Sequence, residues 1–336
     1  MDTLKFISDS GVPVLAADSI LTFHDRVGHF KARWAIHRMN FRVTPGLYAL
    51  GDPSAQSPLF ASANYKMSFD ALRTNLKGMA AWLLVLDTKG VNVWCAAGKG
   101  TFGTDELVRK IKETQLDKFV SHRKIILPQL AAPGVAAHAV KKASGFSVVY
   151  GPVRASDIPA FLAANNTATP EMRRVKFTFA DRLALVPVEL VGALRYGVPL
   201  MALAIILAGI TRQGYFPAAA LHRGVSAALC IAAALFAGAV LAPLALPLLP
   251  GRAFSMKGLF AGLLAVAGLY AWNKELGPAW FFIVPAAASF LAMNFTGAST
   301  YTSLSGVKKE MRVALPLQIA GVLVGAVCGI MQLLTR

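Results

Sequence analysis

The sequence predicts an α/β domain followed by an all-α domain of membrane-spanning helices. Two observations support this fold class. Up to about Arg182 the chain carries charges, prolines and alternating patterns, whereas long apolar runs take over beyond it. Within the first part, strand-like runs alternate with helical patterns, which is typical of a Rossmann-like, largely parallel sheet covered by helices. A chain of 336 residues is long enough for both domains.

The α/β domain is expected to span about residues 1–165. Strand-like runs lie at Trp82–Leu86 (a helix end or a buried strand), Val91–Trp94, 124–130 and 145–153. A helix is expected over 104–116, because Leu107, Ile111 and Leu116 recur at helical spacing, with Thr104 or Asp105 as its cap. A second helix is expected to follow the Pro133-Gly134 pair.

Small residues follow the expected strands, where ligands bind in sheets of this kind. The carboxyl ends carry residues 62–64, 92–103, 128–134 and 150–154. Glycine, proline and small polar side chains dominate these segments, which suits a broad, flat ligand.

About five apolar segments are candidates to cross a membrane as helices, which takes roughly 20 residues each. They lie at 188–210, 225–249, 254–272, 277–296 and 313–334, after a linker at 166–187. Glu189 and Arg195 lie near the start of the first segment, so an interfacial amphipathic helix over 177–195 is an alternative there. The Ser/Thr-rich loop at 293–312 is either a solvated turn or a docking surface.

Basic residues predict the orientation of these spans. Lys and Arg concentrate in 173–182, 252–257 and 308–312, which places the N-terminal domain in the cytoplasm and the spans in the inner membrane. Residues 1–16 contain Asp2, Asp9 and Pro13 and do not look like a signal peptide, which agrees. The net charge of +17 is then explained by attraction to membrane lipid and requires no nucleic acid.

The segment NVWCAAGKGTFGT, residues 92–104, admits three interpretations. A nucleoside triphosphate loop would need glycine at Val93 and Ser or Thr at Gly100, so it is disfavoured. The pattern Gly98-x-Gly100-x-x-Gly103 matches a dinucleotide fingerprint, with Asp117 downstream for a ribose, but leaves Asn92, Trp94 and Cys95 without a role. The third interpretation is a cofactor held partly by Cys95, which on the segment alone competes with an inert, buried cysteine.

Five stretches of the chain together resemble a known family. They are PGLYALGDP (45–53), ASANYKMSFDALR (61–73), LVLDTKGVNVWCAAGKGTFGTDELV (84–108), HRKIILPQLAAPGVAAHAVKKASGF (122–146) and VYGPVRASDI (149–158). The family is the corrinoid protein of microbial mercury methylation, whose soluble domain is similar to the corrinoid-binding domain of the corrinoid iron–sulfur protein of acetyl-CoA synthesis. Ser62 departs from the Thr usual in related corrinoid domains, although it keeps a hydroxyl.

The resemblance implies a corrinoid, a cobalamin with its own base displaced, bound at the strand ends. The cofactor-binding residues that it implies are Ser62, Asn64, Asn92, Val93, Trp94, Cys95, Ala96, Ala97, Gly98, Lys99, Gly100, Pro133, Gly134, Gly151 and Pro152. Cys95 is expected to be the lower axial ligand of cobalt and the catalytic residue. Asn92 and Trp94 are expected to hold the loop that carries it.

The implied reaction moves a methyl group from methyl-cobalt(III) to inorganic Hg(II), giving methylmercury. Because Hg(II) is an electrophile, the methyl group must leave with its bonding electrons or as a radical. In the first case an anionic sulfur ligand stabilises the resulting cobalt(III) better than a neutral imidazole would.

Several partners and alternatives follow from this interpretation. The chain has three isolated cysteines and no pattern for an iron–sulfur cluster, so a ferredoxin-like protein with four-iron four-sulfur clusters is expected as reductant. A separate methyltransferase is expected to donate the methyl group. The alternative function is that of a membrane-bound methyl carrier of one-carbon metabolism, with mercury as a side substrate. A hypothesis from a different functional class is a membrane transporter or receptor with a sensory α/β domain.

Overall fold

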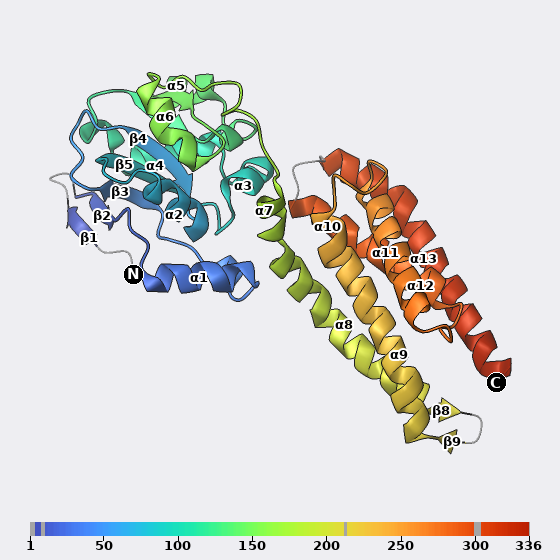
Figure 1. The fold of residues 1–336 in the computed structure, drawn as a ribbon. Helices are drawn as coiled ribbons and strands as arrows, with labels where there is room; N and C mark the ends of the chain where they lie inside the picture. Colours follow the sequence, from blue (N-terminus) through green and yellow to red (C-terminus); the bar gives the residue numbers. More distant parts are fainter. Residues whose placement is uncertain (1–3, 8–10, 212–213, 299–303, 336) are drawn as a thin grey trace. The chain divides into compact units, whose positions relative to one another are not determined.

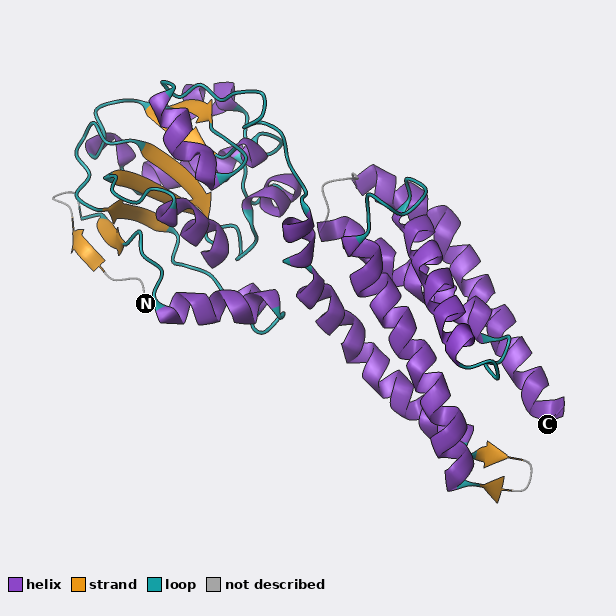
Figure 2. Cartoon of the chain, in the orientation of Figure 1, coloured by secondary structure: helices purple, strands orange, loops and turns teal. Residues whose placement is uncertain are grey.

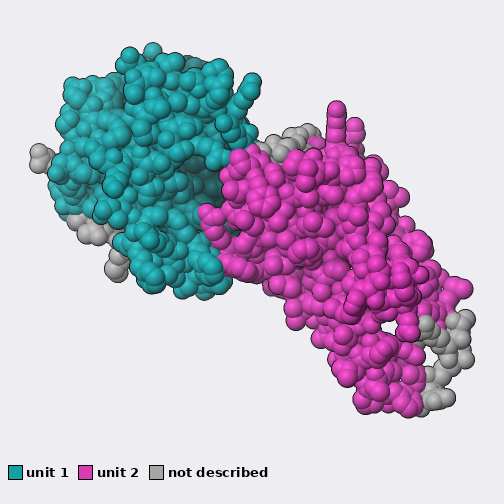
Figure 3. All heavy atoms as spheres, viewed as in Figure 1, with its two compact units in different colours: residues 1–32, 36–176 teal, residues 33–35, 177–336 magenta. Residues whose placement is uncertain are grey.

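The computed structural model describes residues 4–7, 11–211, 214–298 and 304–335 (Figure 1). The chain forms two compact units (Figure 3). The first comprises Met1–Ala32 with Ile36–Lys176, and the second comprises Arg33–Ala35 with Phe177–Arg336.

The first unit is built on a mixed sheet. Its strands are β1 (Leu4–Ile7), β2 (Pro13–Ala17), β3 (Gly46–Leu50), β4 (Leu59–Ala63), β5 (Ala81–Leu86), β6 (Lys124–Leu127) and β7 (Ser147–Tyr150). Within the described residues they pair in the order β1-β2-β3-β5-β4-β6-β7, antiparallel at β1/β2 and β3/β5 and parallel elsewhere. The carboxyl ends of β5, β4, β6 and β7 therefore share one edge of the sheet, as the sequence predicts.

Helices cover both faces of this sheet (Figure 2). The helices in this part of the chain are α1 (Phe23–Arg33), α2 (Lys66–Thr74), α3 (Val93–Lys99), α4 (Thr104–Glu113), α5 (Ala137–Ser144) and α6 (Ile158–Ala163), with short 3-10 helices at Arg38–Asn40, Leu116–Lys118, Gln129–Ala131 and Ala155–Asp157. Successive residues of β5 point to opposite faces. Leu84 therefore packs in one core with α3, α4 and α5, whereas Leu83 packs in a second core with α2 and α6.

Two local predictions are wrong. Val91–Trp94 is not a strand, because a turn leads directly into α3 at Val93. Helix α4 begins at Thr104 as predicted, but neither Thr104 nor Asp105 is its N-cap. Gly103 takes that position and, lacking a side chain, makes no side-chain cap. The Thr104 hydroxyl instead accepts a hydrogen bond from the Ala136 backbone N–H at 2.9 Å, which joins α4 to the start of α5.

The second unit is a set of apolar helices. They are α7 (Phe179–Leu183), α8 (Val186–Ala208), α9 (Pro217–Phe236), α10 (Ala242–Leu244), α11 (Phe254–Trp272), α12 (Trp280–Asn294) and α13 (Leu304–Thr335), with a π-helical stretch at Ala237–Leu241, a 3-10 helix at Phe295–Ala298 and a hairpin of β8 (Ile210–Thr211) and β9 (Gly214–Tyr215). In the described part, 4 helical stretches are long and apolar enough to cross a membrane. Helix α12 is apolar but shorter, at 15 residues.

Four of the five predicted spans correspond to these long helices and the one at 277–296 to the shorter α12, with two differences in detail. Helix α8 runs unbroken through Glu189 and Arg195, so no separate interfacial helix extends to 195. The second span starts at Pro217 and not at 225. Residues 299–303 of the Ser/Thr-rich loop lie outside the described residues, and the described remainder of that loop includes the first turns of α13.

Candidate functional site

A cavity of about 350 Å³ lies at the carboxyl ends of the parallel strands. Its lining comes from β4, β6, the segment after β7, the start of α3 and one side of α2. Of the residues predicted to bind the cofactor, those that line it are Ser62, Asn92, Val93, Trp94, Gly151 and Pro152. The structure thus brings together three predicted segments that lie up to 90 positions apart in the sequence.

Helix α3 begins at this cavity because of a side-chain cap. The Asn92 side-chain oxygen accepts a hydrogen bond from the Cys95 backbone N–H at 2.9 Å, which satisfies a donor of the first helical turn. This bond fixes the backbone of Cys95, whose side chain is half-buried. Trp94, next to it, leaves 39% of its surface exposed and lines the cavity.

Asn64 supports the loop before α3 and does not line the cavity. It is 2% exposed. Its side-chain oxygen accepts hydrogen bonds from the Thr88 hydroxyl at 2.8 Å, the Thr88 N–H at 3.1 Å and the Gly90 N–H at 3.0 Å. The Thr88 hydroxyl also donates to the Val91 carbonyl at 2.7 Å. Asn64 and Thr88 therefore fix the turn that delivers Asn92.

Asp87 completes this turn. Burial raises the pKa of its carboxyl, but hydrogen bonds from Lys89 and the charges of Lys89 and Arg42 outweigh burial, so that the pKa lies below its ordinary value. Asp87 also accepts a hydrogen bond from the Asn64 amide at 3.2 Å. The sequence interpretation missed Asp87 and Thr88 as supporting residues, although both belong to the LVLDTKG stretch.

The glycines at the end of α3 do not form a dinucleotide site. Gly98 lies inside α3, and Gly100 is its C-cap, with φ 82° in the left-handed region that favours glycine. A dinucleotide fingerprint places its glycines between a strand and the first turn of the following helix. Here a complete helix intervenes, so the dinucleotide interpretation is wrong.

The remaining predicted residues divide between packing and exposed positions. Ala96 and Ala97 are buried in the core, whereas Lys99 and Pro133 are exposed. Gly134 allows a close approach, because a Cβ there would fall 2.4 Å from the Phe102 carbonyl oxygen and 2.9 Å from that of Ala97. Gly98 is the opposite case: a Cβ there would meet no atom within 4 Å.

The donor set suits a metal that brings most of its own ligands. Among the residues that the structure describes, no group of three or more His, Cys, Asp or Glu side chains is placed to hold a metal ion. A metal held in this part of the chain would therefore have to bring most of its ligands with it, as a cofactor with a four-nitrogen macrocycle does.

Removing the Asn92 cap tests the local geometry. We expect Asn92→Ala to destabilise the first turn of α3 by about 1 kcal/mol, because the Cys95 N–H loses its acceptor. Hydrogen–deuterium exchange over 93–99 measures this. Asn92→Asp keeps an acceptor and serves as the control; equal exchange in both variants would show that the cap does not fix the helix start.

Part of the chain is similar to known proteins. Residues 34–162 match the family described as CO dehydrogenase/acetyl-CoA synthase delta subunit. The chain is 32% identical over 130 residues to the acetyl-CoA decarbonylase/synthase complex subunit gamma of Archaeoglobus fulgidus, covering 38% of this chain and 27% of the relative. It is 29% identical over 126 residues to the corrinoid/iron-sulfur protein large subunit of Moorella thermoacetica, covering 37% and 28%.

The chain thus spans about a quarter of the length of these curated relatives. The predicted similarity to the corrinoid iron–sulfur protein is confirmed for the α/β unit. The resemblance to the mercury-methylation protein stays a prediction. Residues 34–162 thus match a family of the acetyl-CoA synthase system, and 37–38% of the chain is similar to a subunit of acetyl-CoA decarbonylase/synthase and to a corrinoid/iron-sulfur protein.

Proposed function

We propose that the α/β unit binds a corrinoid at the strand-end cavity and that the chain is a membrane-bound methyl carrier. One observation carries this proposal: Asn92, Val93 and Trp94 line the cavity directly before Cys95, opposite the strand ends. When bound, a corrinoid supplies a cobalt that accepts a methyl group from one molecule and passes it to another. The similarity to a corrinoid/iron-sulfur protein supports the same cofactor.

The residues present fit such a group. The half-buried Cys95 offers a sulfur donor in a first helical turn that Asn92 holds in place. The open space beside Gly98 leaves room for a large ligand against α3. The cavity is mostly apolar and too small for a whole corrinoid, so it suits only part of the cofactor, such as its displaced tail. We therefore assign Cys95 to the metal and Ser62, Gly151 and Pro152 to the cavity.

A second candidate function is methyl transfer to Hg(II), and Cys95 favours it. The Cys95 thiolate would donate negative charge to the metal and so stabilise it after loss of a methyl group with its bonding electrons. Hg(II) is an electrophile and accepts the methyl group in that form, giving methylmercury. A carrier that passes methyl groups to nucleophiles gains nothing from an anionic ligand, so the acceptor distinguishes the two candidates.

The proposed function implies partners and a location. A separate methyltransferase would load the methyl group, and a ferredoxin-like protein with four-iron four-sulfur clusters would return the metal to its reduced state. We infer that the α/β unit lies in the cytoplasm, because Lys and Arg concentrate in the segments on its side of the predicted spans.

Anaerobic reconstitution of the full chain in detergent with cobalamin tests the proposal. We expect stoichiometric cobalt and the absorption spectrum of a corrinoid whose base is displaced. A folded protein without bound cobalt would contradict both candidates. If methylated holoprotein converts Hg(II) to methylmercury but does not methylate a low-molecular-weight thiol, the second candidate holds; the reverse outcome leaves the carrier.

Two glycines give a matched pair of variants. We expect Gly98→Ala to keep the fold, since its Cβ meets nothing and Ala favours a helix, yet to weaken corrinoid binding by roughly tenfold through overpacking against the cofactor. Gly134→Ala is expected to destabilise the unit even without cofactor, because its Cβ would clash with the backbone of Ala97 and Phe102. Thermal unfolding and cobalamin titration measure the two effects; unchanged affinity in Gly98→Ala would place the cofactor elsewhere.

A further inference from the structure

Helix α1 has an inverted arrangement of polar and apolar side chains. Asp25, His29 and Ala32 recur at i, i+4 and i+7 and face the domain, where Asp25 and Ala32 are buried. Phe23 and Phe30, seven residues apart, lie on the opposite side and are 82% and 60% exposed. A surface helix normally buries its apolar stripe and exposes its charges. The inversion is informative, because buried charges and exposed large apolar side chains both require an explanation.

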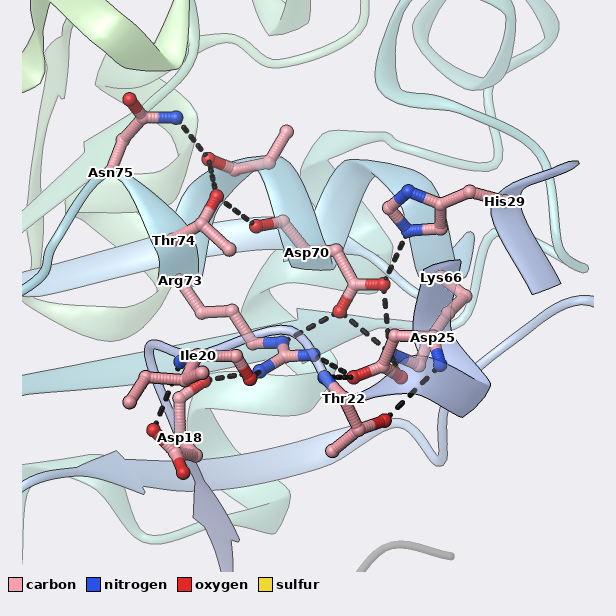
Figure 4. A network of polar contacts seen from close by, with 11 residues as sticks. Asp18, Ile20, Thr22, Asp25, His29, Lys66, Asp70, Arg73, Thr74 and Asn75 are labelled. Carbon is pink, nitrogen blue, oxygen red and sulfur yellow. Dashed lines mark hydrogen bonds and ion pairs between the residues drawn. The ribbon is translucent and has the colours of Figure 1, made fainter. Parts of the chain in front are cut away.

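A network of ion pairs holds the inward face (Figure 4). Lys66 Nζ of α2 lies 2.7 Å from Asp25 Oδ1 and 2.6 Å from Asp70 Oδ1. Arg73 Nη2 lies 2.8 Å from Asp25 Oδ2, and its Nε lies 2.6 Å from Asp70 Oδ1. His29 Nε2 lies 2.7 Å from Asp70 Oδ2. Three basic residues and two carboxylates thus join α1 to α2.

The carboxylates in this network are stable as anions. Burial raises the pKa of Asp25, but hydrogen bonds from Lys66, the Thr22 backbone and Arg73, together with the charge of Lys66, outweigh burial and hold the pKa far below its ordinary value. Asp25 also accepts from the Thr22 N–H at 3.0 Å, and its own N–H donates to the Thr22 hydroxyl at 3.1 Å, which caps α1. The helix is therefore fixed in one orientation, and its outward face is a defined surface.

The outward face combines exposed apolar and basic side chains. Ile36 and Met39, which follow the helix in the chain, are also 47% and 62% exposed. Arg26 and Lys31 are also exposed, and helical spacing places them on the two flanks of the stripe formed by Phe23 and Phe30. Between Phe23 and Arg42, Asp25 is the one acidic residue, and its carboxylate is used in the inward network. The face thus combines apolar and aromatic side chains with charged residues that are all basic.

We propose that this face, Phe23, Arg26, Phe30 and Lys31, docks on the surface of an anionic phospholipid bilayer, with the exposed Ile36 and Met39 that follow it. Aromatic and aliphatic side chains enter the headgroup region of such a bilayer, while Arg and Lys pair with its phosphates. The same chain carries helices that can cross a membrane, so the domain is tethered beside a bilayer. Docking would restrict the orientations in which the α/β unit faces its soluble partners.

Photo-crosslinking from this face tests the proposal with the full chain. The full chain with Phe30→p-benzoylphenylalanine is placed in nanodiscs of phosphatidylcholine with or without phosphatidylglycerol. After irradiation, lipid adducts are identified by mass spectrometry. We expect phosphatidylglycerol adducts at position 30. The matched control is Ile7→p-benzoylphenylalanine, since Ile7 is apolar and 62% exposed on β1 of the same unit, and it is expected to give none.

Charge reversal adds a second measurement. Arg26→Glu combined with Lys31→Glu is expected to lower the adduct yield at position 30 about tenfold, because each basic residue contributes to attraction by anionic lipid. No lipid adduct at position 30, or a yield unaffected by phosphatidylglycerol and by charge reversal, would overturn the proposal. Adducts with an acidic protein in native membranes in place of lipid would also overturn it and assign the face to a protein partner.

Discussion

Replacing Cys95 with alanine is expected to reduce methyl transfer at least about 100-fold, because losing even an outer partner of a metal ligand typically costs 10–100-fold. The α/β unit is expected to stay folded. The Asn92 cap uses the backbone N–H of residue 95, which alanine keeps, and alanine is the best helix former. Methyl transfer at matched protein level and matched corrinoid occupancy measures the effect.

Cys328→Ala is the matched control, because Cys328 is a half-buried cysteine on a helix like Cys95. It is expected to keep full activity. If Cys95→Ala transferred methyl groups as fast as this control, the sulfur would have no part in the reaction, and Cys95 would be a structural residue.

Replacing Asp70 with asparagine is expected to destabilise the α/β unit by about 3–5 kcal/mol, the typical cost of breaking a buried ion pair. The Asp70 side chain is 1% exposed and contacts His29, Lys66 and Arg73. Asparagine keeps the shape but leaves Lys66 and Arg73 with Asp25 as their one remaining carboxylate in the network. Hydrogen–deuterium exchange in β4 and β5 under increasing denaturant measures the free energy of opening.

The pH dependence of this effect has a defined sign. Burial raises the pKa of Asp70, but its bonds to His29, Lys66 and Arg73 outweigh burial and lower it. The stabilisation by the Asp70 ion pairs is therefore fully present above the unfolded-state pKa of about 4. It is lost as the pH falls through the folded-state pKa. Asp52→Asn, which removes an exposed pair with Lys5, is the control and is expected to change nothing measurable. Equal stability of the two variants at neutral pH would show that the buried network does not stabilise the unit.

The strand ends could be predicted from the sequence, whereas the start of α3 could not. Apolar runs such as Ala81–Leu86 are buried on both faces of the sheet. The sequence left Trp82–Leu86 as either a helix end or a buried strand, and the structure shows the strand. Val91–Trp94 has the same local character, yet it turns into a helix because Asn92 caps Cys95 and Thr88 binds the Val91 carbonyl. Asn92 is itself an N-cap signal that the β-type pattern of its neighbours obscured.

The buried ion network is the part of the fold that local patterns could not predict. Asp25 and Lys66 lie 41 positions apart, and Asp25 and Arg73 lie 48 apart. Each residue alone is typical of a solvated surface, so only the tertiary structure shows that they meet. The apolar helices were easier to predict from the sequence, because the interior of a lipid bilayer permits few structures other than helices. The start of α9 was misplaced because His222 and Arg223 interrupt the apolar pattern of its first turns.

X-ray absorption at the cobalt edge of the reconstituted holoprotein tests the central claim most directly, because it reports the atoms bound to the metal. We predict one sulfur ligand to cobalt in the wild type and its loss in Cys95→Ala, with the nitrogen ligands of the macrocycle unchanged. A cobalt surrounded only by nitrogen and oxygen in the wild type, with an identical spectrum in Cys95→Ala, would contradict the assignment of Cys95 to the metal.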